Sequence, residues 1–190
     1  MMIDDAIELV TRSLEVVYLE SAAARVADTQ WRNSAKECAA ALTDASPSEV
    51  MRCAVHESGH AIAATCGGLH VERACVRADG TGSCDYRVTD ESQTIERIVA
   101  DLGGVAAELL LGADEERQFA LAHSQDILLA RIHIEELRAQ RPDQELTAAT
   151  CAKLACCTIA SNMRAIDRVA RVLFALGEAD GAIIAALARP

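Results

Sequence analysis

Aromatic residues are scarce in this sequence, which has one tryptophan, two tyrosines and two phenylalanines among its 190 residues. Prolines are also few, at three. Strands favour β-branched and aromatic side chains, whereas alanine and leucine, which supply much of the 51% hydrophobic content, lose little on entering a helix. A mainly α fold is therefore expected, and the length suffices for one domain with a sizeable core plus a helical extension.

Positive charge is in short supply as well. The chain has 18 Lys and Arg against 29 Asp and Glu, for a formal net charge of -11. Such a surface repels a phosphate backbone, which argues against a nucleic-acid partner and against an anionic membrane surface. No apolar run reaches the roughly 18 residues of a transmembrane span, and residues 1–5 lack the basic start of a secretory signal. A cytoplasmic location without a membrane span is the expectation.

The eight cysteines form no CxxC pair and match no common disulfide framework. Without a secretory signal, we expect them to be reduced and mostly buried as small apolar side chains. Cys75 and Cys84 flank a predicted turn and could face each other.

Helix signals dominate the first third of the chain. Apolar residues recur at helical spacing over residues 4–43, where Trp31 is expected to anchor one long or two shorter helices to the core. Ser46, Pro47 and Glu49 then form a strong helix start, as cap, first position and capping-box acid. That helix is expected to end at Gly67-Gly68.

The rest of the chain predicts one hairpin followed by helices. Residues 69–77 and 83–89 flank glycine-containing turn residues and read as a small β-hairpin. A glycine pair at 103–104 costs about 1 kcal/mol per residue relative to alanine inside the next predicted helix, which indicates a bend or the close approach of another helix. The predicted helices span residues 92–111, 124–141, 146–160 and 162–188, with a loop or broken segment at 113–123.

The motif His56-Glu57-Ser58-Gly59-His60 lies inside the helix that begins near residue 47. Positions i and i+4 of a helix lie about 40° apart, so the two imidazoles can share one ion, and zinc accepts neutral imidazole nitrogen. Glu57 lies beside the pair, where its carboxylate can reach a water at the ion without serving as a ligand. Chance or surface placement is the competing interpretation. The apolar flanks argue against it, because buried histidine and glutamate need partners.

Two imidazoles do not complete a catalytic zinc site, which usually has three protein ligands and one open position. Two carboxylates are candidates for the third ligand. Glu108 lies on the glycine-pair helix, where a solvated helix face would also explain it, and Asp126 lies in the first turn of the helix after Ser124, where an acid is favourable in any case. Spacing alone does not choose between them.

Four segments resemble the FtsH-type zinc peptidase domain. They are VHESGHAIAA at residues 55–64, LGGVAAELLLG at 102–112, HSQDILLA at 123–130, and NMRAIDRVARVLFALGEADGAIIAAL at 162–187, in the family's order and spacing. The resemblance covers about residues 47–190, which divides the chain into an N-terminal helical extension (1–45) and a peptidase domain (46–190). It implies His56, His60 and Asp126 as zinc ligands, Glu57 as catalytic base, and a mostly helical fold with a small hairpin near the cleft.

The chain also departs from the family pattern. Ser58 replaces the usual alanine, Gln125 replaces a common asparagine, and no GxxxxGK[ST] phosphate-binding loop occurs in the 190 residues. The resemblance therefore implies a stand-alone zinc endopeptidase that cuts flexible or unfolded polypeptides without ATP of its own. A homo-oligomer and a separate ATPase partner are both compatible with it.

One hairpin edge, at residues 71–77 or 84–88, could pair with an extended substrate. Two alternatives to a peptidase remain: an inactive metal-binding adaptor or regulatory protein on the same scaffold, and a purely structural helical domain with an accidental motif. Retention of Glu57 argues against the adaptor, because an inactive relative has no chemical need for it.

Overall fold

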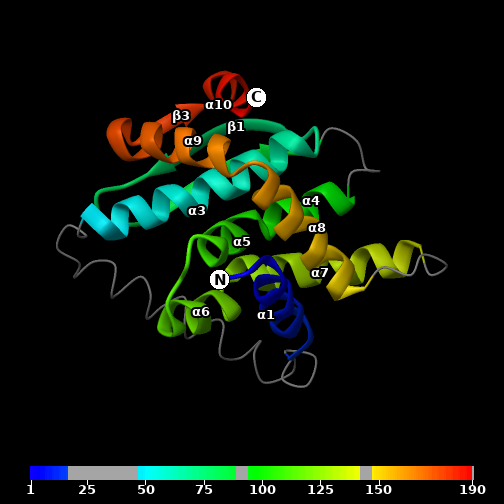
Figure 1. The fold of residues 1–190 in the computed structure, drawn as a ribbon. Helices are drawn as coiled ribbons and strands as arrows, with labels where there is room; N and C mark the ends of the chain where they lie inside the picture. Colours follow the sequence, from blue (N-terminus) through cyan, green and yellow to red (C-terminus); the bar gives the residue numbers. More distant parts are fainter. Residues whose placement is uncertain (17–46, 89–93, 142–146, 190) are drawn as a thin grey trace.

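The computed structural model describes residues 1–16, 47–88, 94–141 and 147–189 (Figure 1). Most of the expected N-terminal extension, including Trp31 and the capping residue Ser46, lies outside the described residues. Within the described ranges the protein is mainly helical with one small antiparallel sheet, which confirms the predicted fold class.

Helix α3 (Pro47–Cys66) carries the histidine motif and runs through the middle of the molecule, between α9 (Met163–Leu176) and α5 (Gly103–Leu110) (Figure 1). Its central residues are enclosed, and Ala61 through Ala64 have no exposed surface. The helix ends at the predicted glycines, where Gly68 adopts a positive φ of 74°. A helix enclosed on several sides holds its side chains in fixed positions, which suits a site that must bring separate groups together.

The predicted hairpin is present as β1 (His70–Val76) and β2 (Gly82–Arg87), paired from His70↔Arg87 to Val76↔Gly82. A third strand, β3 (Glu178–Asp180), pairs antiparallel with β1 and gives the sheet order β2-β1-β3. The prediction of one helix over 162–188 is wrong at this point. Gly177, with φ 80°, ends α9, and three residues pair with β1 before α10 (Gly181–Ala188) begins. A three-residue strand has no sequence period of its own and depends on its partner strand.

The structure differs from two further predictions between residues 92 and 123. The single helix expected over 92–111 is broken at Leu102 into α4 (Thr94–Asp101) and α5, so the glycine pair opens the second helix. The segment expected as a loop contains α6 (Glu115–Ala122), whose start is capped by Asp114 accepting from the Arg117 amide. The residues flanking this short helix carry the cap, and its own sequence has little helical periodicity, which is why pattern analysis missed it.

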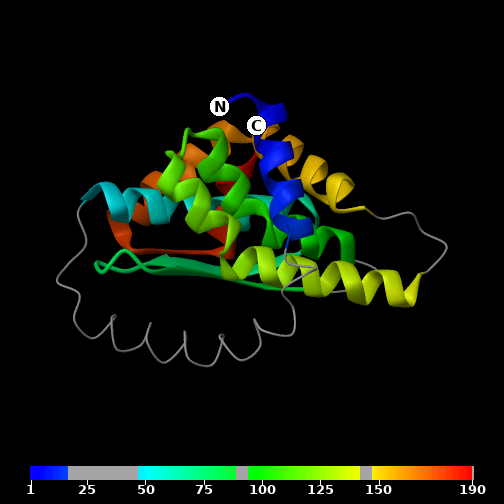
Figure 2. The same cartoon turned by 90° about the horizontal axis from the view of Figure 1, so that it is seen from below.

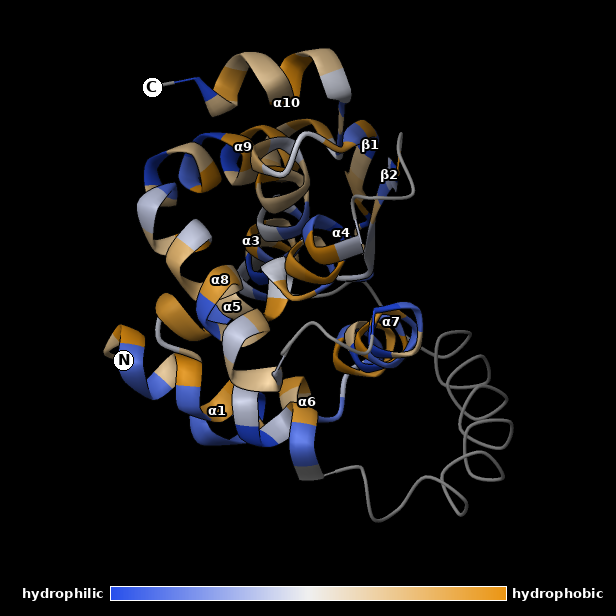
Figure 3. Cartoon of the chain, turned by 90° about the vertical axis from the view of Figure 1, so that its right-hand side faces the viewer, coloured by the Kyte–Doolittle hydropathy of each residue, from blue (hydrophilic) through white to orange (hydrophobic). Residues whose placement is uncertain are grey.

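The remaining helices follow the predictions more closely. Helix α7 (Gln125–Gln140) begins at Ser124, whose side chain accepts from the Ile127 amide, and α8 (Ala148–Ser161) begins at Thr147 in the same manner. Helix α1 (Ile3–Val16) buries one apolar face against α8. Figure 2 shows the hairpin and α7 on one side of the molecule, and Figure 3 shows apolar residues where α3, α5 and α8 meet. None of the helices in the described ranges combines the length and apolar character that a bilayer span needs.

Helices α3 and α5 approach each other through Gly59 and Gly103. A Cβ added to Gly59 would lie 2.4 Å from the Gly103 carbonyl oxygen, and one added to Gly103 would lie 2.5 Å from the Gly59 oxygen. Both neighbours are backbone atoms, which cannot rotate away. The glycines therefore set the spacing of the two helices, in agreement with the close approach expected from the glycine pair.

Replacing Gly59 with alanine is expected to destabilise the protein. Alanine is the better helix former, but a methyl group at this contact must push two helix backbones apart, and such overpacking typically costs about 1–3 kcal/mol. Thermal unfolding followed by circular dichroism measures the change. Ser58→Ala, at the neighbouring buried position, is the control. It adds no atom to the helix contact and removes only the hydrogen bond that the Ser58 hydroxyl donates to the Ala54 carbonyl, so it should cost at most about 1 kcal/mol. Equal stability of Gly59→Ala and the control would show that the helices adjust.

Candidate metal centre

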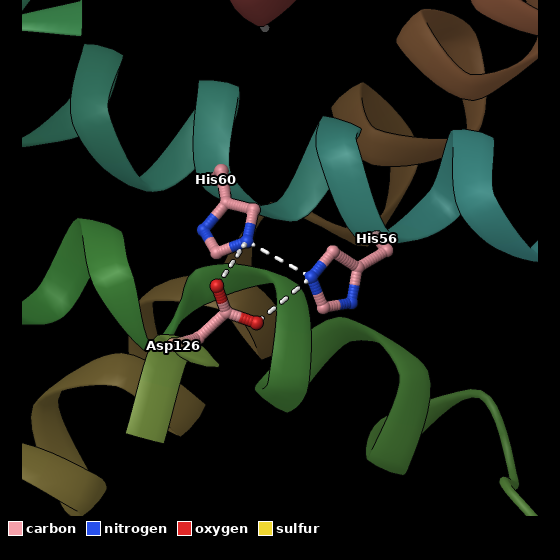
Figure 4. A group of neighbouring side chains, drawn as sticks. All are labelled: His56, His60 and Asp126. Atoms are coloured by element: carbon pink, nitrogen blue, oxygen red, sulfur yellow. Dashed lines mark hydrogen bonds and ion pairs between the residues drawn. The ribbon is translucent and has the colours of Figure 1, made fainter. Parts of the chain in front are cut away.

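Helix α3 presents His56 and His60 on one face, one turn apart. Their Nε2 atoms lie 3.0 Å from each other, and the ring planes meet at 73° (Figure 4). His60 is 6% exposed and His56 is half-buried. The i, i+4 spacing thus brings the two imidazole nitrogens together as predicted from the sequence.

Asp126, in the first turn of α7, faces the same point from a different part of the chain (Figure 4). One carboxylate oxygen lies 3.1 Å from His56 Nε2 and the other 3.6 Å from His60 Nε2. The three donor atoms all lie within 4.8 Å of one another. His56, His60 and Asp126 therefore form a group that could hold a metal ion.

The second nitrogen of each imidazole is engaged behind the site. His60 Nδ1 donates to the Ala100 carbonyl over 2.8 Å, and His56 Nδ1 donates to Glu108 Oε1 over 2.7 Å. These hydrogen bonds fix the orientation of both rings and direct both Nε2 atoms toward Asp126. Such support behind ligating histidines is usual in metal sites.

Glu108 therefore lies on the far side of His56 from Asp126. Its carboxylate is 4% exposed, so the interpretation of this residue as part of a solvated helix face is wrong. Both of its oxygens accept hydrogen bonds from Arg117. Arg117 Nε donates to Oε2 over 2.6 Å, and Arg117 Nη2 donates to Oε1. Burial raises the pKa of Glu108, but the hydrogen bonds from Arg117 and His56 outweigh it and lower the pKa below its usual value. Glu108 is a buried, charged partner of His56 and not a ligand candidate in this arrangement.

The carboxylates also set the charge of the group. Burial alone lowers the pKa of His56, but its hydrogen bonds to Asp126 and Glu108 prevail and raise it to about 10. Burial raises the pKa of Asp126, and the neighbouring histidines lower it to about 2. The negative potential that favours an imidazolium here also favours a bound cation.

Gly104 permits the backbone of α5 to pass close to the two imidazoles. A Cβ at this position would lie 2.5 Å from His60 Nε2 and 2.6 Å from His56 Nε2. Any other residue would crowd the atoms that face Asp126. The two imidazole nitrogens and the carboxylate could hold a metal ion that accepts nitrogen and oxygen ligands.

Glu57 lies next to the group, and strand β2 passes close to it. A Cβ added to Gly82, the first residue of β2, would lie 2.7 Å from Glu57 Oε1 and 2.8 Å from Cys53 Sγ. The glycine therefore permits the strand to approach the carboxylate. Glu57 is 7% exposed, and burial raises its pKa despite the opposing effect of His60 and His56.

The thiols of Cys53 and Cys84 lie outside the group of possible ligands, which contains His56, His60 and Asp126. Burial raises the pKa of Cys53 to about 12, and burial with the charge of Glu57 raises the pKa of Cys84 still further. The seven cysteines within the described ranges are free, as expected, but only Cys151 and Cys156 are buried, so the expectation that most cysteines are buried is wrong for these residues. Cys75 contacts the Ser83 hydroxyl over 3.2 Å.

Several residues around the site were not identified from the sequence. Arg117 belongs to the segment expected as a loop, and the Ala100 carbonyl carries no side-chain signal. Gly82 and Gly104 were noted only as turn and helix-contact glycines. Glycine destabilises a regular helix or strand, so each of these glycines indicated that another part of the chain passes close by. The sequence did not show which side chains those were.

No protein-family model matches the chain, and no curated protein matches it.

Proposed function

We propose that this chain is a zinc-dependent endopeptidase of the FtsH type that hydrolyses flexible or unfolded polypeptides. The observation that carries the proposal is the convergence of His56, His60 and Asp126 beside the buried carboxylate of Glu57. These four residues lie in two of the four segments that resemble the FtsH-type peptidase domain, and we extend that resemblance to the chain as part of this proposal.

The donor set favours zinc over the hard cations. Calcium and magnesium bind mainly oxygen, whereas two imidazole nitrogens and one carboxylate match the three protein ligands of many catalytic zinc sites. Three ligands leave one coordination position open for chemistry, and a structural zinc site usually fills all four. When bound, zinc lowers the pKa of a coordinated water toward about 7 and polarises the scissile carbonyl.

Glu57 serves as the general base and then as the general acid. Its carboxylate takes a proton from the attacking water and passes it to the leaving amine. Burial raises the pKa of Glu57, and a carboxylate with a higher proton affinity is a stronger base. His56 and His60 are oriented from behind by Glu108 and Ala100, so neither needs to reorient during the reaction.

The position of the sheet supports a polypeptide substrate. Strand β1 pairs with β2 along its length and with β3 over Arg73–Cys75, so its central residues offer no edge. Among the described strands, β2 and the shorter β3 each pair only with β1, and β2 is the longer edge. An extended peptide could add to the outer edge of β2, which begins beside Glu57. Strand addition needs a substrate segment free of its own hydrogen bonds, which favours flexible or unfolded polypeptides. None of these steps uses a nucleotide.

Metal removal tests the proposal. The protein stripped with a chelator and the protein reloaded with one equivalent of zinc are compared on an unfolded casein-like substrate, with new N-termini counted over time. We expect the stripped protein to be inactive, zinc to restore cleavage, and magnesium to restore none of it. Bound zinc without cleavage across a broad peptide library would favour the inactive adaptor, and absence of zinc binding would leave only the structural domain.

A further inference from the structure

A second buried polar cluster lies next to the metal centre and centres on Asp101, at the end of α4. One carboxylate oxygen of Asp101 accepts from His133 Nδ1 over 2.6 Å, and the other accepts from the Tyr86 hydroxyl through a shorter contact. Asp101 is 6% exposed and His133 is 5% exposed. Burial and the Asp101 charge raise the pKa of Tyr86, so its hydroxyl stays a donor. The cluster joins α4, α7 and β2.

Each of these three elements carries part of the proposed active site. Asp101 follows Ala100, whose carbonyl accepts from His60. His133 lies seven residues after Asp126 on α7, and seven residues make nearly two full turns, so both side chains lie within about 20° of each other on one helix face. They stand about 10 Å apart along the axis. Tyr86 belongs to the strand that passes Glu57.

We propose that Asp101 and His133 are a positioning pair for the third metal ligand. The histidine ligands come from α3, whereas Asp126 comes from α7, and these helices are far apart in sequence. The Asp101–His133 hydrogen bond ties the ligand-bearing face of α7 to α4, and α4 in turn holds His60 through Ala100. It thereby fixes the distance between Asp126 and the two imidazoles. This inference rests on the proposed function, in which these three side chains bind zinc.

The Asp101–His133 pair is better explained as fixing the positions of α4 and α7 than as stabilising the fold. Well-packed apolar residues often stabilise a protein as much as a buried charged pair does, because the desolvation penalty offsets the attraction. A directional hydrogen bond fixes the relative position of two helices more narrowly than apolar contact does. Loss of the Asp101–His133 hydrogen bond is therefore expected to weaken zinc binding more than an equal loss of folding stability elsewhere in the protein would.

Two isosteric variants separate the hydrogen bond from the shape of the side chain. His133→Leu removes the donor, whereas His133→Asn has the same branching and places an amide nitrogen where Nδ1 lies. Zinc affinity is measured by competition with a chromophoric chelator, on the full chain. Loss of a supporting partner typically weakens metal binding about 10–100-fold, so we expect that loss for leucine and recovery of most of the affinity for asparagine.

A stability control accompanies these variants. Ile166→Val removes one buried methyl group in α9, outside the site, and should lower the melting temperature without weakening zinc binding. If leucine at 133 does not fold, His133→Met, which also lacks an N–H donor and adapts to irregular space, replaces it and is judged by the same criteria.

The outcomes are distinct. The positioning role would be overturned if the variant without the donor bound zinc as tightly as the wild type. It would also be overturned if that variant and His133→Asn lost equal zinc affinity, because the hydrogen bond would then be irrelevant. A loss that merely matches that of an equally destabilised Ile166→Val would overturn it as well. If the wild type itself binds no zinc, the proposed function fails, and this inference fails with it.

Discussion

Zinc-loaded Glu57→Gln is expected to cleave an unfolded substrate at least about 10²-fold and up to about 10⁴-fold more slowly than the zinc-loaded wild type, the range typical of general acid–base catalysis. Glutamine keeps the size of the side chain and removes its basicity. The variant should still bind zinc and keep its fold, because His56, His60 and Asp126 are untouched. Initial cleavage rates on a casein-like chain, with bound zinc measured in both samples, give the comparison.

Two controls make this result interpretable. His60→Ala should lose metal and activity together, which separates a missing ligand from a missing base. Equal cleavage by wild type and Glu57→Gln would point to a contaminating protease or to another base. If neither cleaves any member of a broad peptide library while zinc is confirmed in both, the inactive metal-binding adaptor becomes the better interpretation.

Asp126→Ala is expected to show the largest loss of zinc affinity among the carboxylate variants. Its carboxylate faces the Nε2 atoms of His56 and His60, so its removal leaves only two protein donors. Glu108→Gln should weaken zinc binding less, by about the 10–100-fold typical of a partner behind a ligand, because the amide oxygen can still accept from His56. Competition with a chelator of known affinity measures both.

An exposed acid supplies the matched control. Glu116→Ala in α6 removes one negative charge outside the site and should leave zinc affinity near the wild-type value. This control shows how much of any loss comes from net charge alone. If Asp126→Ala keeps its zinc while the Glu108 variant loses it, the third ligand is Glu108, and the assignment made here is wrong.

The secondary structure could be predicted where local signals were strong. The start of α3 near Pro47, its end at the glycines and the turn of the β1–β2 hairpin were found from the sequence, as was the Ser124 cap of α7. Helix α6 and strand β3 were missed. A helix of eight residues shows few turns of periodicity, and β3 exists because β1 offers it hydrogen-bonding partners.

The residues of the candidate site could likewise be predicted only where local geometry fixes them. The i, i+4 pair and its intervening glutamate follow from helix geometry alone, because 3.6 residues per turn fix where His56, Glu57 and His60 point relative to one another. The third ligand did not follow. Asp126 and Glu108 were equally open by spacing, and only the family resemblance favoured Asp126.

The sequence by itself determined a mainly helical protein with a histidine pair spaced to share one ion, because composition and local periodicity act within a few residues of chain. The tertiary structure decided which carboxylate faces the imidazoles and which supports one from behind. It also decided that β2 is an edge strand among the described strands and that this strand begins beside Glu57. These relations join residues up to 70 positions apart, such as His56 and Asp126, whose distance depends on how α3, α4, α5 and α7 pack. Packing of that kind depends on the whole core and leaves no local pattern in the chain.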